Sequence, residues 1–253
     1  MTPPIPDTLI SRLTSAGAVT FFTGAGVSAE SGVPTFRGTD GIWAKFKPEE
    51  LANLSAFMKN PELVWEWYRA RKTIIATVRP NAGHFALAAM EALFPGCTLI
   101  TQNIDNLHRR AGSRHILELH GNIERNYCLK CGAPYGDEDL PQTEGVPRCS
   151  RAGCAGLIRP DVVWFGEMLP EDEWDAAVRA SAAADVFFSV GTSGIVYPAA
   201  SLPLTAKQQG AFLVEINPEP TSLTRSVDLF LQGLSGEILP AIVERVKEKR
   251  MVG

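Results

Sequence analysis

The stretch GAGVSAESGVPTFR at residues 24–37 directly follows the apolar run AVTFF at 18–22, which is typical of a buried strand. Gly24 and Gly26 permit a tight turn in which the backbone can approach a ligand closely. Backbone N–H groups exposed in such a turn bind phosphate groups. An ordinary strand-to-helix turn would carry the same glycines. An aromatic residue and an arginine at the end of the stretch favour a nucleotide site over a plain turn.

Composition limits the classes of protein to which the chain can belong. It has 253 residues with 24 Lys and Arg against 28 Asp and Glu, so the net charge of −4 argues against a nucleic-acid binder. No segment has the ~20 consecutive apolar residues of a membrane helix. The N-terminus has neither the basic region nor the apolar run of a secretory signal. We therefore expect a cytoplasmic protein without a membrane partner, although a processed organellar protein would look the same. We also expect a monomer.

Apolar strand-like runs alternate with helical patterns along the chain, which indicates an α/β fold with a parallel sheet covered by helices on both faces. Loops that follow parallel strands meet at one edge of the sheet, where such folds bind ligands. Further strands are expected at 97–101, 115–120, 162–165, 185–190, 212–216 and 227–230, and helices at 6–16, 49–54, 61–78, 82–94, 171–184, 198–209 and 236–249. Polar groups follow the strands at 24–37, 102–105, His120, 191–193 and Asn217.

Four of the five cysteines lie in one segment and form two pairs, CxxC and CxxxxC. Four thiolates presented by two tight turns make a closed tetrahedral zinc site, so we expect structural zinc with no open position for catalysis. Unrelated buried thiols or a redox pair would be the alternatives. The ligands are Cys128, Cys131, Cys149 and Cys154. Cys97 stands alone in an apolar run and is expected in the core.

The ordered set GAGVSAESGVPTFRG, TQNIDNLHRRAG, ELHG, paired cysteines, FGE, GTS and INP resembles the sirtuins, the NAD-dependent protein lysine deacylases. The resemblance covers nearly the whole chain. It implies a Rossmann-like NAD-binding domain at 1–36, 82–122 and 160–253, and a small domain. The small domain would combine a helical insertion with the acyl pocket at 37–81 and a zinc-binding module at 123–159.

The resemblance also implies roles for single residues. His120 would be the general base at the ribose hydroxyls, since an imidazole titrates near neutral pH. Asn103 and Asp105 would be catalytic as well, although both residue types also cap helices well. The other three histidines are expected in packing or at the surface. The NAD-binding set would be Gly24, Ala25, Gly26, Ser28, Pro34, Phe36, Arg37, Trp43, Gln102, Asn103, Ile104, Asp105, His120, Gly191, Thr192, Ser193, Asn217, Pro218, Glu219 and Ser235.

The acyl-lysine protein or peptide would lie between residues 163–167 and 194–196 as an added strand. Tyr68 and Arg71 are spaced i, i+3 on one helix, with Ala52 upstream, and resemble the sirtuin subgroup that removes succinyl, malonyl and glutaryl groups. A buried arginine is costly unless an anion pairs with it, and a substrate carboxylate would be that anion. A solvated tyrosine and arginine would be the ordinary interpretation. The substrate set would be Ala52, Tyr68, Arg71, Val163, Phe165, Gly166, Glu167 and Val196.

The predicted function is therefore NAD-dependent removal of succinyl, malonyl and acetyl groups from protein lysine, which yields nicotinamide and O-acyl-ADP-ribose. A deacetylase without a preference for acidic acyl groups, a protein ADP-ribosyltransferase and a non-catalytic NAD sensor are the alternatives. His120 and Asn103 argue against the sensor. A zinc-ribbon module for nucleic acid is disfavoured because the segment around the cysteines is acidic.

Overall fold

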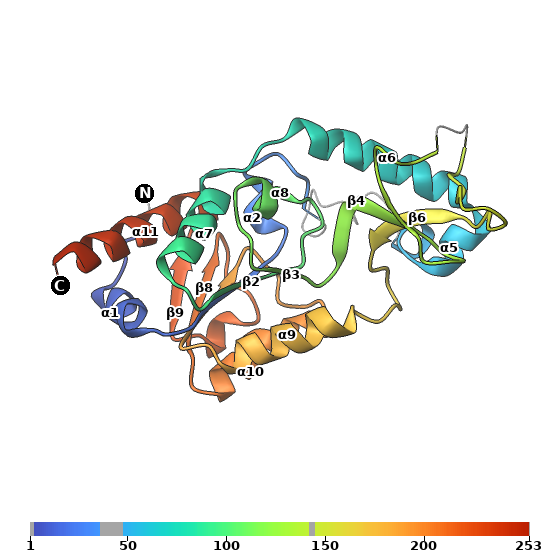
Figure 1. Cartoon of the computed structure of the whole chain (residues 1–253). Coiled ribbons are helices and arrows are strands. Elements are labelled where there is room, and N and C mark those ends of the chain that lie inside the picture. Colours follow the sequence, from blue (N-terminus) through green and yellow to red (C-terminus); the bar gives the residue numbers. More distant parts are fainter. Residues whose placement is uncertain (1–2, 36–47, 142–144, 253) are drawn as a thin grey trace.

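Six parallel strands form the large sheet, in the order β3-β2-β1-β7-β8-β9 (Figure 1). The computed structural model describes residues 3–35, 48–141 and 145–252. The strand order reverses between β1 and β7, and doubly wound sheets bind ligands at such a point. The predicted α/β fold is thus confirmed. The strands are β1 (Val19–Thr23), β2 (Cys97–Thr101), β3 (Ile116–Glu118), β7 (Val186–Val190), β8 (Phe212–Asn217) and β9 (Leu229–Gln232).

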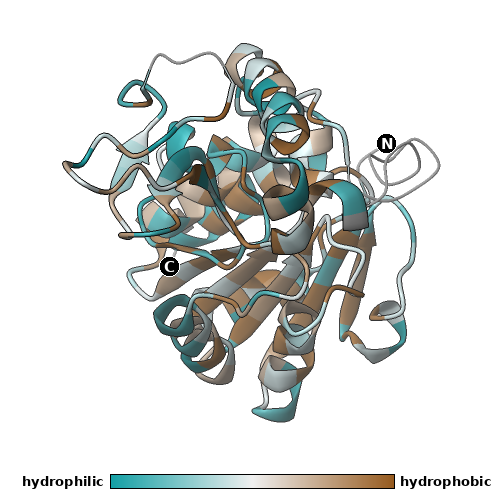
Figure 2. Cartoon of the chain, turned by 90° about the vertical axis from the view of Figure 1, so that its right-hand side faces the viewer, coloured by the Kyte–Doolittle hydropathy of each residue, from teal (hydrophilic) through white to brown (hydrophobic). Residues whose placement is uncertain are grey.

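Helices cover both faces of this sheet. On one face, α1 (Asp7–Ser15), α7 (Ala82–Leu93) and α11 (Ser235–Val252) share an apolar cluster with the strands. On the other, α9 (Glu171–Ala182) and α10 (Leu202–Gln208) share a second cluster. Figure 2 shows apolar colour along the strands and mixed colour on the helices that flank them. Neighbouring residues of each strand therefore point into different cores, and continuous apolar runs result.

Two asparagines fix where the neighbouring helices α6 (Pro61–Thr77) and α7 begin. Asn60 Oδ1 accepts a hydrogen bond from the Leu63 N–H at 3.2 Å, just before the proline that opens α6. Asn81 Oδ1 accepts hydrogen bonds from the first turn of α7, and its Nδ2 donates to the Val27 carbonyl at 2.8 Å. The second asparagine therefore also ties α7 to the loop after β1.

A second, antiparallel sheet has β4 (Gly121–Cys128) between β5 (Pro134–Gly136) and β6 (Ile158–Val162). An apolar cluster joins it to α6, which lies beside it in Figure 1. Trp65 of α6 donates from its indole to the Ile158 carbonyl at 2.9 Å. Lys72, two turns further on, donates to Asn126 and forms an ion pair with Asp137. Helix α6 is thereby anchored along this sheet.

The strand expected at 162–165 was wrong. Residues 158–162 pair with β4 instead, and the chain then turns at Gly166, whose φ is 86°. Glu167 closes the turn, because its carboxylate accepts the Trp164 N–H at 2.8 Å and its own N–H donates to the Trp164 carbonyl at 3.0 Å. A turn, and not a strand, therefore presents these residues.

The remaining elements are short. They are α2 (Gly26–Ala29), α4 (Pro48–Leu51), α5 (Leu54–Lys59), α8 (Leu107–Arg110), and the 3₁₀ segments η1 (Ala199–Ser201) and η2 (Thr224–Ser226). No helix in the described part of the chain combines the length and apolar character that a membrane span requires.

Candidate functional site

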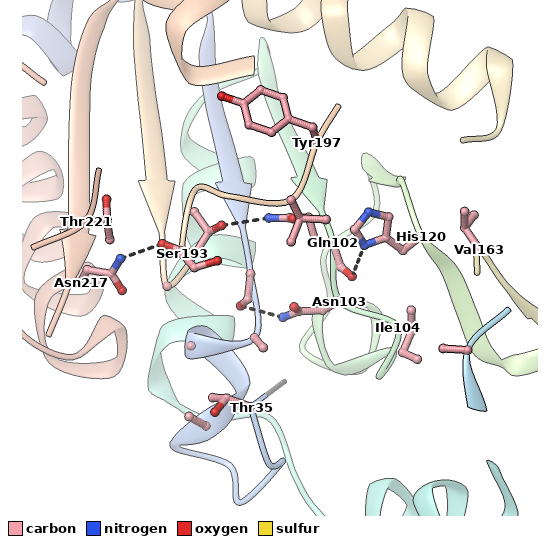
Figure 3. Close-up of a pocket in the computed structure, with 18 of the residues that line it drawn as sticks. Thr35, Gln102, Asn103, Ile104, His120, Val163, Ser193, Tyr197, Asn217 and Thr221 are labelled. Atoms are coloured by element: carbon pink, nitrogen blue, oxygen red, sulfur yellow. Dashed lines mark hydrogen bonds between the residues drawn. The ribbon is translucent and has the colours of Figure 1, made fainter. Parts of the chain in front are cut away.

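A cavity of about 590 Å³ lies where the carboxyl ends of the large-sheet strands face the second sheet. This volume is typical of pockets that bind small molecules and cofactors. Figure 3 shows Gln102, Asn103, His120, Ser193 and Asn217 around it, each at or just after the carboxyl end of a strand of the large sheet. The structure therefore brings together the strand-end groups that the sequence placed at one edge.

The glycine turn after β1 forms one wall of the cavity. The Gly24 N–H donates to the Val190 carbonyl at 3.1 Å, and the Gly26 N–H donates to the Gly191 carbonyl at 2.8 Å. A Cβ atom on Gly26 would lie 2.7 Å from the Gly191 backbone, closer than any side chain tolerates. Glycine is thus required at Gly26 by the contact between two strand ends, and this contact shapes the cavity.

Asn103 is held rigidly in this wall. Its side-chain Nδ2 donates to the Gly24 carbonyl at 3.0 Å and to Ser28 Oγ at 3.2 Å, and only 7% of the residue is exposed. Gln102 next to it donates to Thr192 Oγ1 at 3.0 Å. These bonds join the loops after β1, β2 and β7 around the cavity.

Asp105 lies behind the wall and does not line the cavity. Its Oδ2 accepts the Ser28 hydroxyl at 2.6 Å, and its Oδ1 accepts the Leu107 N–H at 3.0 Å. The carboxylate therefore bonds the first N–H of α8 from one residue before the N-cap position, which is Asn106. It also fixes Ser28, which is equally absent from the lining.

Two further histidines are buried behind this wall. Burial lowers the pKa of His84 to about 3 and that of His108 to about 4. His108 Nε2 lies 3.0 Å from Thr23 Oγ1, and His84 Nε2 lies 3.4 Å from Ser28 Oγ. His115 is exposed. The three residues occupy the packing and surface positions expected of them.

His120 lies at the end of β3, on the side of the cavity that faces the second sheet. Its Nδ1 is 3.1 Å from the Gln102 carbonyl oxygen, which can only accept a hydrogen bond. Nδ1 therefore carries the proton, and the lone pair of the neutral ring is on Nε2. Burial lowers the pKa of His120, and the bond to Gln102 offsets part of that effect. The ring is consequently neutral at physiological pH, as a base must be.

The loops after β7 and β8 form the opposite wall. Asn217 Nδ2 donates to the Thr192 carbonyl at 2.8 Å, which joins the two loops. Buried Glu215 accepts hydrogen bonds from the hydroxyls of Thr221 and Thr224, both at 2.5 Å, and holds the loop after β8 in place. The predicted residues in this wall all line the cavity: Gly191, Thr192, Ser193, Asn217, Pro218, Glu219 and Ser235.

The end of the cavity towards the second sheet is formed by α6 and the turn after β6. The Phe165 N–H donates to the Ala52 carbonyl at 2.9 Å, which joins two segments of this wall. Tyr68 is 1% exposed, and its hydroxyl oxygen accepts the Trp164 indole N–H at 2.8 Å. Seven of the eight predicted substrate residues line the cavity: Ala52, Tyr68, Val163, Phe165, Gly166, Glu167 and Val196.

Arg71 is the eighth, and it is buried next to this wall without lining the cavity. Its guanidinium lies 4.9 Å from the centre of the Trp67 ring, and Trp67 does line the cavity. Burial lowers the pKa of Arg71, while the nearby Tyr68 and Asp105 raise it. The structure thus places a buried cation close to the tyrosine with which the sequence paired it.

Four further predicted NAD-binding residues either do not line the cavity or are not described by the structure. Pro34 is exposed and does not line the cavity. Phe36, Arg37 and Trp43 lie outside the described residues. Sequence reasoning also missed lining residues, among them Trp164, Tyr197, Pro198 and Thr221. Each of them lies within three residues of a predicted one, so adjacency to the motifs was the available signal.

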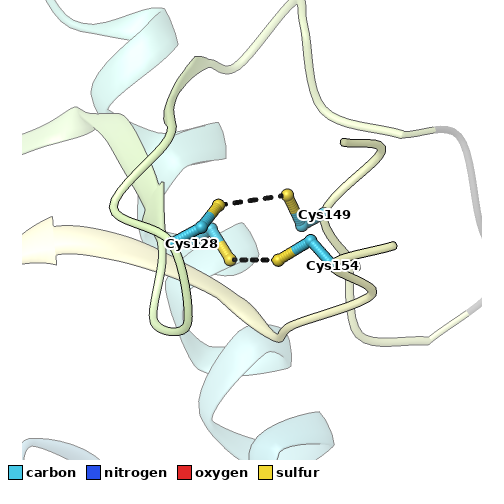
Figure 4. Close-up of side chains that lie close together, drawn as sticks. Cys128, Cys149 and Cys154 are labelled. Carbon is cyan, nitrogen blue, oxygen red and sulfur yellow. Dashed lines mark hydrogen bonds between the residues drawn. The ribbon is translucent and has the colours of Figure 1, made fainter. Parts of the chain in front are cut away.

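The four clustered cysteines meet at the far end of the second sheet (Figure 4). Their sulfur atoms all lie within 4.8 Å of one another, with Cys128 3.6 Å from Cys154 and Cys131 3.6 Å from Cys149. Tetrahedral zinc with ~2.3 Å bonds to sulfur requires sulfur atoms ~3.8 Å apart. The cysteines are therefore positioned to bind a structural zinc ion. Cys97 is buried in the main core, as expected.

A doubly wound sheet with a cavity at its switch point and a four-cysteine module defines a nucleotide-binding α/β protein with a structural metal site. The Sir2 family model matches residues 24–198. The NAD-dependent protein deacylase 2 of Pyrobaculum aerophilum is 53% identical over 237 residues, which cover 94% of each chain. The chain therefore belongs to the Sir2 family, the sirtuins.

Solved structures of similar proteins support this family assignment. A mutant Sir2 homologue in complex with ADP-ribose superimposes with a TM-score of 0.93 at 44% identity, over 98% of this chain and 99% of that one. A Sir2 complex with p53 peptide and NAD⁺ gives a TM-score of 0.83 at 33% identity, over 97% and 98% of the two chains. These similar structures thus hold ADP-ribose in one case, and NAD⁺ together with a peptide in the other.

Proposed function

We propose that this chain is an NAD-dependent protein lysine deacylase that removes succinyl and malonyl groups as well as acetyl groups, and releases nicotinamide and O-acyl-ADP-ribose. Membership of the Sir2 family and the deacylase relatives support the NAD-dependent activity. The preference for acidic acyl groups rests on one observation, a buried arginine just behind the cavity wall and one helical turn from a buried tyrosine that lines it.

The residues present fit NAD. Gly24–Gly26 packing leaves backbone at the cavity surface, and Asn217, Ser193 and Ser235 line the wall where the adenosine half would bind. Bound NAD supplies an electrophilic ribose carbon with nicotinamide as its leaving group. Asn103 would orient the nicotinamide ribose, because its rotamer is locked by two hydrogen bonds. Ser28 and Asp105 would support it from behind the wall.

His120 would act as the general base. The ring proton is on Nδ1, which donates it to the Gln102 carbonyl, so the lone pair of Nε2 can accept a proton. The residue lines the cavity. We assign it the step that takes a proton from a ribose hydroxyl, which makes that oxygen a nucleophile towards the acyl carbon. Burial favours the neutral ring required for this step.

The substrate peptide would lie between residues 163–167 and 194–196. The backbone N–H of Val163 already donates to the His120 carbonyl at 3.0 Å, so this segment is held next to the base. An acyl-lysine entering there would point its acyl group towards Ala52 and Tyr68, both of which line that end of the cavity.

The acidic-acyl preference follows from charge. Arg71 is 8% exposed and lies just behind Trp67 and Tyr68, which line the cavity. A carboxylate arriving at this end would therefore gain an opposite charge in a poorly solvated place, in addition to the nearby Asp105 carboxylate that already favours the charged form of Arg71. An acetyl group offers no such partner. Ala52 contributes only a methyl group to the wall and leaves room for the longer acyl chain.

The test compares Arg71→Met with Arg69→Met. Both remove one positive charge from α6, but Arg69 is exposed and donates to the Gly145 carbonyl, away from the cavity. Arg71→Met should lower kcat/KM for succinyl-lysine peptide about 10- to 100-fold more than for acetyl-lysine peptide. Arg69→Met should leave the ratio of the two values unchanged. Equal losses on both substrates in Arg71→Met would refute the acidic-acyl preference.

A further inference from the structure

Trp164 and Tyr68 form a deeply buried polar contact in the wall at the end of the cavity towards the second sheet. The indole Nε1–H of Trp164 donates to the Tyr68 hydroxyl oxygen at 2.8 Å. Trp164 is 2% exposed and Tyr68 1% exposed, yet both line the cavity. One comes from the turn after β6 and the other from α6, so the bond joins segments 96 residues apart in the chain.

The indole ring is itself fixed by an ion pair. The Arg159 guanidinium lies 3.4 Å from the centre of the Trp164 ring, and its Nη atoms donate to the Glu167 carboxylate at 2.5 and 3.0 Å. Glu167 also accepts the backbone N–H of Trp164. A third bond runs from Arg159 to the Val162 carbonyl at 2.7 Å. The position of the indole N–H is therefore set by contacts on its face and on its backbone.

The direction of the Trp164–Tyr68 bond has a consequence for Tyr68. An indole N–H can only donate, so the Tyr68 oxygen must accept, and its own proton remains to be donated elsewhere. Burial raises the pKa of Tyr68 to about 12, so that proton is present throughout the physiological range. A hydroxyl with one acceptor site occupied by a fixed donor is suited to donate to an acceptor in the cavity.

We propose that Trp164 is a specificity-determining positioning residue, which orients the Tyr68 hydroxyl so that it donates to the carboxylate of an acidic acyl-lysine. Trp164 acts through Tyr68 and contributes no hydrogen bond of its own to the substrate. This inference rests on the proposed preference for acidic acyl groups.

The test uses Trp164→Phe, which keeps an aromatic ring and removes the N–H. Its control is Trp65→Phe, since Trp65 is 1% exposed on α6 and donates from its indole to the Ile158 carbonyl at 2.9 Å, but does not line the cavity. Trp164→Phe should lower the succinyl-to-acetyl ratio of kcat/KM about tenfold, mainly through KM for the succinyl peptide. Trp65→Phe should not move this ratio.

A double-mutant cycle separates positioning from packing. If Trp164 acts through the hydroxyl, Trp164→Phe should change the ratio in the wild-type background and leave it unchanged in Tyr68→Phe. Equal effects of Trp164→Phe in both backgrounds would overturn the proposal.

Arg71→Met distinguishes a failure of the positioning role of Trp164 from a failure of the acidic-acyl preference. If Arg71→Met lowers the ratio and folded Trp164→Phe does not, the positioning role falls while the acidic-acyl preference stands. If Arg71→Met leaves the ratio unchanged, both fall.

A measurement on the wild-type protein covers the case in which Trp164→Phe does not fold. The chain has five tryptophans, whose indole N–H resonances can be resolved by ¹⁵N labelling and assigned through nuclear Overhauser contacts. Succinyl-lysine peptide should shift the Trp164 indole resonance clearly more than acetyl-lysine peptide does, because only the former accepts a bond from Tyr68. Equal shifts with both peptides would overturn the proposal.

Discussion

Glu167→Gln tests how much the ion pair between Arg159 and Glu167, which lies against the Trp164 ring, contributes to the free energy of unfolding. The substitution keeps the shape of the side chain and one acceptor oxygen, but it removes the negative charge opposite Arg159. The Arg159 side chain is 1% exposed, whereas that of Glu167 is 25% exposed. Breaking a fully buried pair from one side costs ~3–5 kcal/mol, because a charge is left uncompensated. The partial exposure of Glu167 and the remaining bonds from Arg159 to the Pro160 and Val162 carbonyls reduce this to ~2–3 kcal/mol.

The matched control is Asp161→Asn, since Asp161 lies on β6 and also pairs with an arginine. The distance from Arg125 Nε to Asp161 Oδ2 is 2.9 Å, but the two side chains are 47% and 41% exposed. Exposed pairs contribute ~0–1 kcal/mol. The two variants therefore remove the same charge from the same type of pair and differ chiefly in burial.

Equilibrium urea unfolding of the zinc-loaded proteins measures the difference. With a denaturant slope of ~3 kcal/mol per molar for a chain of this size, Glu167→Gln should lower the midpoint by ~0.7–1 M. Asp161→Asn should lower it by no more than ~0.3 M. Equal midpoints for the two variants, or a more stable Glu167→Gln, would refute the reasoning that burial decides the cost.

Three further predictions concern the base, the glycine turn and the metal. His120→Ala should lower kcat/KM about 10²- to 10⁴-fold. Because burial lowers the pKa of His120, the neutral base persists as the pH falls, and the acid limb of the wild-type pH profile should lie below pH 6.5; a limb above it would contradict this. Gly26→Ala should raise the Kd for ADP-ribose, measured by calorimetry, at least tenfold. Gly17→Ala is the control and should leave this Kd unchanged, because its Cβ would lie 3.6 Å from the nearest atom. Chelation of zinc should speed amide hydrogen exchange in β4 and β6 and leave β1 protected; unchanged exchange after metal loss would show that the cysteines fold without it.

Much of the large sheet could be predicted because its strands are continuous apolar runs. Residues 97–101 and 186–190 lie between two helical layers, so their side chains need no alternation and stand out in the sequence. Strand β4 was not predicted, because it buries polar residues. Asn122 and Asn126 are 3% and 2% exposed, and they donate to Glu118 and Asp137, which no local pattern can reveal.

The site could be predicted in outline for a topological reason. Parallel strands carry their following loops to one edge, so the order of strands and loops along the chain is enough to predict that His120 and Asn103 lie close together. What topology does not supply is the direction of side chains. The expected strand at 162–165 was wrong because Glu167 folds back onto the Trp164 N–H, and this contact depends on Arg159 from the preceding strand. Trp164 was therefore not singled out.

Helix α6 divides two tasks among residues that are close in sequence. Trp65 and Lys72 hold it to the antiparallel sheet, whereas Tyr68, one turn from each, lines the cavity. Trp65 and Lys72 anchor the helix from positions outside the cavity lining, so an exchange at Tyr68 would remove its bond to Trp164 but leave both of these anchors in place. A lineage of such enzymes could thus acquire a new acyl preference through one or two substitutions on a scaffold that stays intact.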